Sequence, residues 1–124
     1  MTGIVDTTVN EFGQSLGLPE LAFNSSGSLS LSIEGLGMLF MERGEGEVLV
    51  YIARSVPRFT EKVFQRALEL CNPDRGHFTD VQAGLKGEDV LVFAVRLSDQ
   101  EFSLHTINDA IRLLGGLHDH AVKG

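Results

Sequence analysis

The sequence has few of the features that mark secreted or membrane proteins. Cys71 is its single cysteine, so no internal disulfide can form. No stretch approaches the ~20 consecutive apolar residues of a membrane-spanning helix. Residues 1–10 contain neither a basic side chain nor a long apolar run, which argues against a secretory signal peptide. The chain is therefore suited to a reducing cytoplasm, and we expect Cys71, at the end of an apolar helical run, to pack rather than to act as a nucleophile.

Basic residues are also scarce. The 124 residues include 10 Lys and Arg against 17 Asp and Glu, a formal net charge of -7. An acidic surface repels phosphate backbones and anionic lipid surfaces, which argues against nucleic acid and against stable membrane insertion. This charge suits a protein or cationic partner, although it also simply keeps a small domain soluble. The 43% of hydrophobic and 22% of charged residues are typical of a globular chain.

The side chains that usually carry chemistry form no catalytic pattern. Of the four histidines, His118 and His120 flank Asp119, but no third strong metal ligand is nearby, and we interpret 117–124 as a solvated polar tail. The glycines of 35–37 precede a predicted strand, whereas a phosphate-binding loop needs a helix behind it. No nucleophile has a base at motif spacing. The sequence therefore predicts no enzyme, no cofactor and no metal site.

Hydrophobic periodicity predicts a helix, a three-stranded meander, a second helix, a hairpin and a third helix. Apolar residues recur at helical spacing in the helices, and they alternate or run continuously in the strands. Gly115 and Gly116 are expected to end or fray the last helix, which begins at the capping-box pattern of 98–101 or a few residues later. The predicted fold class is α+β, with an antiparallel five-stranded sheet, three helices and the order α-β-β-β-α-β-β-α, in one domain over 1–124. The predicted elements are helices over 4–16, 59–71 and about 102–114, and strands over 29–33, 38–43, 47–54, 81–85 and 90–97.

These elements carry a large amount of apolar surface for so short a chain. All three helices have apolar stripes, and the strands over 47–54 and 90–97 are apolar on both faces. Apolar surface left over on a small protein usually binds a partner or a second copy. The alternative is that the helices cover both sides of the sheet and bury all of it.

Several segments resemble the class I chaperones of type III secretion, and in particular their SycN branch. The resemblance extends from about Ile4 to Leu117 and covers the order of the elements and the short acidic chain. Each segment alone is weak evidence for the family, but together and in this order they are fairly specific for it. The segments are 12–19 (FGQSLGLP), 52–55 (IARS), 83–85 (AGL) and 90–93 (VLVF).

The resemblance implies a dimeric, non-enzymatic chaperone in the bacterial cytoplasm or at the periphery of the secretion apparatus, with a role in virulence. Such a chaperone binds the extended N-terminal segment of a secreted protein. The SycN branch implies a heterodimer with a YscB-like chaperone subunit and a YopN-like gatekeeper as cargo. The alternatives are a homodimeric effector chaperone of the same fold and, more distantly, a small ligand-binding α+β domain.

The resemblance also implies two binding surfaces, one for the second subunit and one for the cargo. The sequence alone does not show which of their residues belong to the core and which face a partner. The dimer surface falls on the second helix and the strand after it, at Phe59, Val63, Phe64, Ala67, Leu68 and Val81. The cargo surface falls on the first helix and first strands, at Val5, Val9, Phe12, Leu29, Leu31, Ile33, Met38 and Phe40. It offers no role for His118 or His120.

Overall fold

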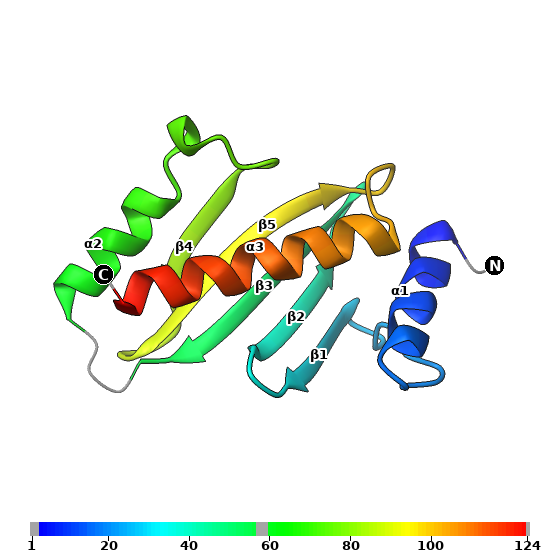
Figure 1. The fold of residues 1–124 in the computed structure, drawn as a ribbon. Coiled ribbons are helices and arrows are strands. Elements are labelled where there is room, and N and C mark those ends of the chain that lie inside the picture. Colours follow the sequence, from blue (N-terminus) through cyan, green and yellow to red (C-terminus); the bar gives the residue numbers. More distant parts are fainter. Residues whose placement is uncertain (1–2, 57–59, 124) are drawn as a thin grey trace.

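The computed structural model describes residues 3–56 and 60–123. The predicted order of elements is confirmed, with α1 and a meander first, then α2, a hairpin and α3 (Figure 1). Because Phe59 lies outside the described residues, its predicted interface role is left aside. The elements are α1 (Ile4–Ser15), β1 (Ser28–Ile33), β2 (Gly37–Arg43), β3 (Glu47–Ser55), α2 (Glu61–Leu70), a short 3-10 helix (Pro73–Arg75), β4 (Val81–Leu85), β5 (Val90–Ser98) and α3 (Leu104–Lys123).

The five strands form one antiparallel sheet in the order β1-β2-β3-β5-β4. β3 is central, which agrees with its continuous apolar sequence, and β1 and β4 are the edges. The register places Leu39 beside Ile52 and Ile52 beside Phe93, so that one row of side chains crosses the middle of the sheet. All three residues are fully buried.

The helices lie on one face of this sheet rather than on both. α3 crosses the face over β3 and β5, while α1 and α2 pack at its two ends (Figure 1). The side chains that point toward the helices form the core, and nearly all of them are fully buried. Since neighbouring residues of a strand point to opposite faces, the alternate set points away from every described helix. The alternative in which the helices cover both sides of the sheet and bury all of it is therefore wrong.

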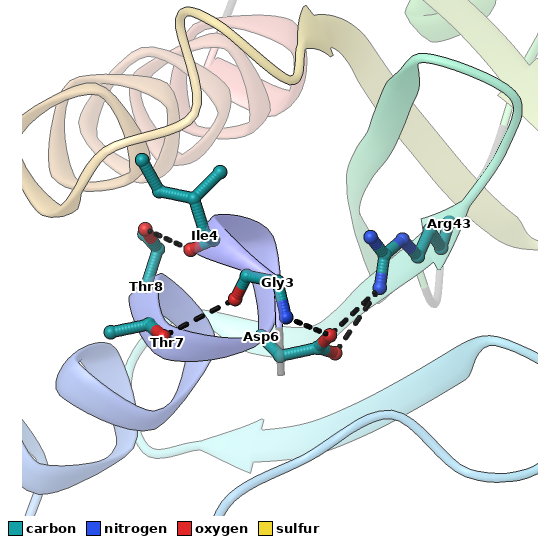
Figure 2. A network of polar contacts seen from close by, with 6 residues as sticks. All are labelled: Gly3, Ile4, Asp6, Thr7, Thr8 and Arg43. Atoms are coloured by element: carbon teal, nitrogen blue, oxygen red, sulfur yellow. Dashed lines mark hydrogen bonds and ion pairs between the residues drawn. The ribbon is translucent and has the colours of Figure 1, made fainter. Parts of the chain in front are cut away.

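The start of α1 is attached to the end of β2 by a carboxylate. Asp6 accepts a hydrogen bond from the backbone N–H of Gly3 at 3.3 Å and contacts Nη1 of Arg43 through both oxygens, at 3.1 and 3.2 Å (Figure 2). A carboxylate in the first turn also suits the partial positive charge of a helix N-terminus. This contact helps to set the position of α1 on the sheet.

The predicted polar tail over 117–124 is wrong for the residues that the structure describes, because α3 continues to Lys123. Leu117, His118 and Ala121 extend the apolar stripe of Leu114 at helical spacing, and all are buried. Gly115 does not end the helix. A Cβ at Gly115 would lie 3.0 Å from Leu36 Cδ1, so the glycine allows the β1–β2 turn to pack against α3.

The capping-box pattern at 98–101 forms but does not start the helix. Ser98 Oγ and a Glu101 carboxylate oxygen lie 2.8 Å apart, and Glu101 N–H donates to Ser98 Oγ at 3.2 Å. α3 begins at Leu104, where Ser103 Oγ accepts from the N–H of Thr106 at 3.1 Å. The later of the two predicted starts is therefore correct, and Ser103 is the N-terminal cap.

Candidate functional site

The predicted dimer surface divides into buried and exposed residues. Val63, Ala67 and Val81 are buried within this chain, where they join the core beneath α2 and β4. Phe64 is partly buried against that core. Leu68 is 50% exposed, the largest exposed fraction among the described residues of this set. We therefore reassign the three buried residues to the core, because a side chain enclosed by its own chain has no surface to offer a partner.

Further exposed apolar side chains lie on segments next to α2. Phe78 is 53% exposed in the segment before β4, and Leu85 is 43% exposed at the end of β4. Val122 is 50% exposed near the end of α3, which Arg66 of α2 contacts through the carbonyl of Ala121. This side of the molecule thus carries several large apolar side chains in water.

The predicted cargo surface divides in the same way. Four residues of the predicted cargo surface, on α1 and at the start of β1, are buried, so we reassign them to the core. They are Val5, Val9, Phe12 and Leu29. Leu31 and Ile33 point toward the helix side but stay half-buried, because β1 is an edge strand. Met38 is 37% exposed and Phe40 is half-buried, both on the other side of the sheet.

The sheet face away from the helices, here called the open face, has an apolar centre. Phe40 and Tyr51 stack across β2 and β3 with ring centroids 4.8 Å apart and an interplanar angle of 12°. Burial, and then the hydrogen bond and charge of the neighbouring Glu42 carboxylate, raise the pKa of the Tyr51 phenol, which stays neutral. The apolar residues of the open face are Met38, Phe40, Leu49, Tyr51, Ala53, Val90, Val92 and Ala94. Ser30 and Ser32 lie along its β1 edge, and the polar residues Glu42, Glu47, Gln82 and Arg96 lie on the same face.

A shallow hollow of about 640 Å³ adjoins this centre where β2 begins, and it is here called the turn hollow. Its lining includes Gly37, where the φ of +120° disfavours any side chain and a Cβ would lie 2.8 Å from the Ala53 carbonyl oxygen. Ser32 and Ser55 supply hydroxyl groups at its margin. The remaining lining residues are Ile33, Gly35, Leu36, Met38, Phe40, Ala53, Arg54, Lys86 and Val90.

His118 is a buried polar residue that sequence patterns did not identify. Its Nε2 lies 2.7 Å from the Ile52 carbonyl, and its ring packs edge-on against Phe93 at 4.9 Å. Burial lowers the pKa of His118 to about 4, against the raising effect of the Ile52 carbonyl. The imidazole is therefore neutral at pH 7, and its N–H donates to that carbonyl. It holds α3 to β3.

Two kinds of feature are absent from the part of the chain that the structure describes. Over residues 3–56 and 60–123, no group of three or more His, Cys, Asp or Glu side chains is placed to hold a metal ion. In the same part of the chain, no helix is long and apolar enough to cross a membrane. What the fold leaves at the surface is apolar area, on the open face and beside α2.

These features define a small α+β protein with uncovered apolar surface. The chain belongs to the family of the type III secretory system chaperone SycN, whose model matches residues 4–122. No curated protein matches it in sequence.

Three solved structures share the fold at low sequence identity. A chain of the ExsC–ExsE complex aligns with a TM-score of 0.72 and 18% identity, over 94% of this chain and 87% of that one. The Yersinia pestis type III secretion chaperone SycH, solved with a stable fragment of YscM2, gives 0.66 and 17%, over 96% and 98%. A chain of the heterodimeric ExoU–SpcU complex of the Pseudomonas aeruginosa type III secretion system gives 0.67 and 22%, over 97% and 96%. The predicted resemblance and fold class are confirmed.

Proposed function

We propose that this chain is one subunit of a heterodimeric chaperone that holds the N-terminal segment of a secreted gatekeeper protein of the YopN-like kind. Its partner subunit is a second small chaperone of the YscB-like kind. The observation that carries the proposal is the one-sided fold, in which all helices cover one sheet face and leave apolar surface elsewhere. Membership of the SycN family supports the choice of partner and cargo.

The subunit interface is proposed on the exposed side of α2, with Leu68 at its centre and Phe64 beside it. Covering apolar area releases about 25 cal/mol per Å², which favours association of such surfaces. Leu68→Asp places a carboxylate in the interface, where an unpaired charge is strongly disfavoured. We expect the subunits to associate at least ~100-fold more weakly, which corresponds to roughly 3 kcal/mol.

The cargo surface is proposed at the β1 edge and the adjoining open face, with Leu31, Ile33, Met38 and Phe40 as contacts. An extended cargo segment loses conformational entropy on binding, so its affinity must come from a large wrapped area. The exposed serines Ser30 and Ser32 keep the free surface partly polar.

The experiment co-expresses the chain with a candidate gatekeeper N-terminal segment and a second small chaperone, and measures the mass of the purified complex by light scattering. The proposal expects one copy of each chaperone with one cargo segment. Leu68→Asp should remove the partner subunit, while Leu16→Asp, a matched change at an exposed leucine after α1, should not. A well-folded monomer that retains neither partner nor cargo contradicts the proposal.

A second candidate is a homodimeric chaperone of an effector with a different cargo. Its effector cargo is favoured by the similar solved structures, which include the chaperone–effector complex HopA1–SchA. The two candidates differ in composition. A complex with two copies of this chain and no second chaperone supports the homodimer.

A further inference from the structure

We infer that the turn hollow binds an apolar side chain of the partner polypeptide together with a carboxylate directly beside it, which pairs with Lys86. The occupant is an acidic–apolar stretch of the extended cargo segment, so the inference rests on the proposed function. It adds what that function leaves open, namely the chemistry by which one part of the cargo is selected.

The apolar half of the site is built by three strands. Phe40, stacked on Tyr51, and Ala53 form its floor, and Met38 and Val90 stand at its sides. Met38 keeps 37% of its surface exposed, so a ligand side chain has area to cover. Methionine is flexible enough to adapt to aliphatic or aromatic ligands.

The charged half of the site is Lys86. Its Nζ lies 4.6 Å from the centre of the Phe40 ring, so the ammonium group stands over the apolar floor. The Lys86 N–H donates to the Val90 carbonyl at 2.9 Å, which fixes the backbone of the β4–β5 turn at this point. Among the described residues, no carboxylate comes within ion-pair distance of Lys86.

The second cation of the hollow, Arg54, is already engaged. Its Nε donates to the Leu36 carbonyl, and its Nη1 lies 2.7 Å from Asp119 Oδ1. Arg54 thereby shapes the hollow without offering a free charge. Among the described lining residues, Lys86 is left as the cation that an incoming group can neutralise.

The charge of the hollow is opposite to that of the whole chain. The chain carries a net charge of -7, yet the described residues that line the hollow include two cations and no carboxylate. The acidic residues of the two adjacent turns, Glu34, Glu88 and Asp89, are exposed and form no ion pair with Lys86. A ligand carboxylate gains a partner here, whereas a ligand ammonium meets a like charge. The apolar ligand side chain excludes water from the pair and strengthens it.

The probes are capped tetrapeptides, acetyl-Ser-Leu-Asp-Ser-amide and its Leu-Asn and Leu-Lys counterparts, titrated into the isotope-labelled full chain by NMR. We expect amide shifts at Gly35, Gly37, Ser55 and Lys86, and binding of the Asp probe ~5-fold tighter than the Asn probe. The Lys probe should bind most weakly. Raising the salt from 0.05 to 0.5 M should reduce the preference for Asp.

Lys86→Met keeps an unbranched chain over Phe40 and removes the charge, so it should abolish the preference for Asp while the Asn probe still binds. Arg75→Met, which removes an exposed cation from the short 3-10 helix, should change nothing. Equal affinity of the three probes, or a preference for Asp that survives in Lys86→Met, overturns the inference.

The same variant in the co-expression experiment separates this inference from the proposed function. If the Lys86→Met variant retains as much cargo as the wild type, the role of the hollow is refuted and the proposed chaperone function is unaffected. Discrimination between the probes without retention of any secreted cargo supports the hollow and refutes the proposed function.

Discussion

Acidification should weaken the fold through His118, whose side chain is almost fully enclosed. The groups around it are the Ile52 carbonyl and Arg54 of β3, the Phe93 ring of β5 and Asp119 of its own helix. Burial lowers the pKa of His118 from 6.5 to about 4. The unfolded chain therefore takes up a proton at a higher pH than the folded chain does.

The sign and size of the effect follow from this gap. A base with a lowered folded-state pKa leaves stability unaffected above pH 6.5 and reduces it as the pH falls from 6.5 to 4. At about 1.4 kcal/mol per pH unit, the free energy of unfolding should drop by about 2 kcal/mol between pH 7 and pH 5 from this residue alone. Below pH 4 the loss is complete, at about 3 kcal/mol.

Urea unfolding at pH 7 and pH 5, at one fixed protein concentration, measures this drop. The control is His118→Gln, whose amide can still donate to the Ile52 carbonyl but does not titrate. The other histidines and all carboxylates are the same in both proteins, so the difference between the two drops isolates His118. The wild type should lose about 2 kcal/mol more than the variant. Equal losses would refute a neutral, buried His118.

Three further predictions concern single positions. Gly13→Ala should destabilise the fold by more than about 1 kcal/mol, although alanine has the better helix propensity, because its Cβ would lie 2.5 Å from that of Leu21. Gly116→Ala has open space around it and should stabilise the fold by roughly 0.5–1 kcal/mol. Thermal unfolding compares the two variants, and a gain in stability for both would refute the close approach at Gly13. Ser103→Ala should cost about 1 kcal/mol in the same assay if α3 starts at Leu104, and a neutral result would contradict that start. Burial raises the pKa of the Cys71 thiol, so iodoacetamide at pH 7.5 should alkylate it several-fold more slowly than free glutathione, and an equal rate would show an accessible thiolate.

Much of the fold was predictable from local patterns. Three local patterns were each enough to predict the type and position of an element. They are the strict alternation at 29–33, the apolar run of β3 and the apolar stripe of α2. The side of the sheet on which the helices pack was not predictable. It depends on how α3 reaches β3 through His118 and Leu36, and these are contacts between residues distant in sequence.

The end of α3 shows how a local rule fails. Two consecutive glycines normally end a helix, and histidines at a C-terminus normally indicate solvent. Here Leu114, Leu117 and Ala121 continue the stripe, and packing against the sheet outweighs the poor helix propensity of Gly115 and Gly116. The spacing of these apolar residues was the available signal.

The candidate surfaces were predictable as regions but not as residues. The stripe of α2 contains both Ala67, fully buried, and Leu68, half-exposed, and only the tertiary packing separates them. Lys86 had no sequence signal. Its position over Phe40 arises from the pairing of four strands and the β4–β5 turn.

The central claim is that other polypeptides cover the apolar surface beside α2 and on the open face. Native mass spectrometry of the chain, co-expressed with a second small chaperone and a gatekeeper N-terminal segment, tests it directly. The account predicts a complex of both chaperones with one cargo segment, which Leu68→Asp takes apart and Leu16→Asp leaves intact. A folded chain that remains monomeric and free of both would contradict it.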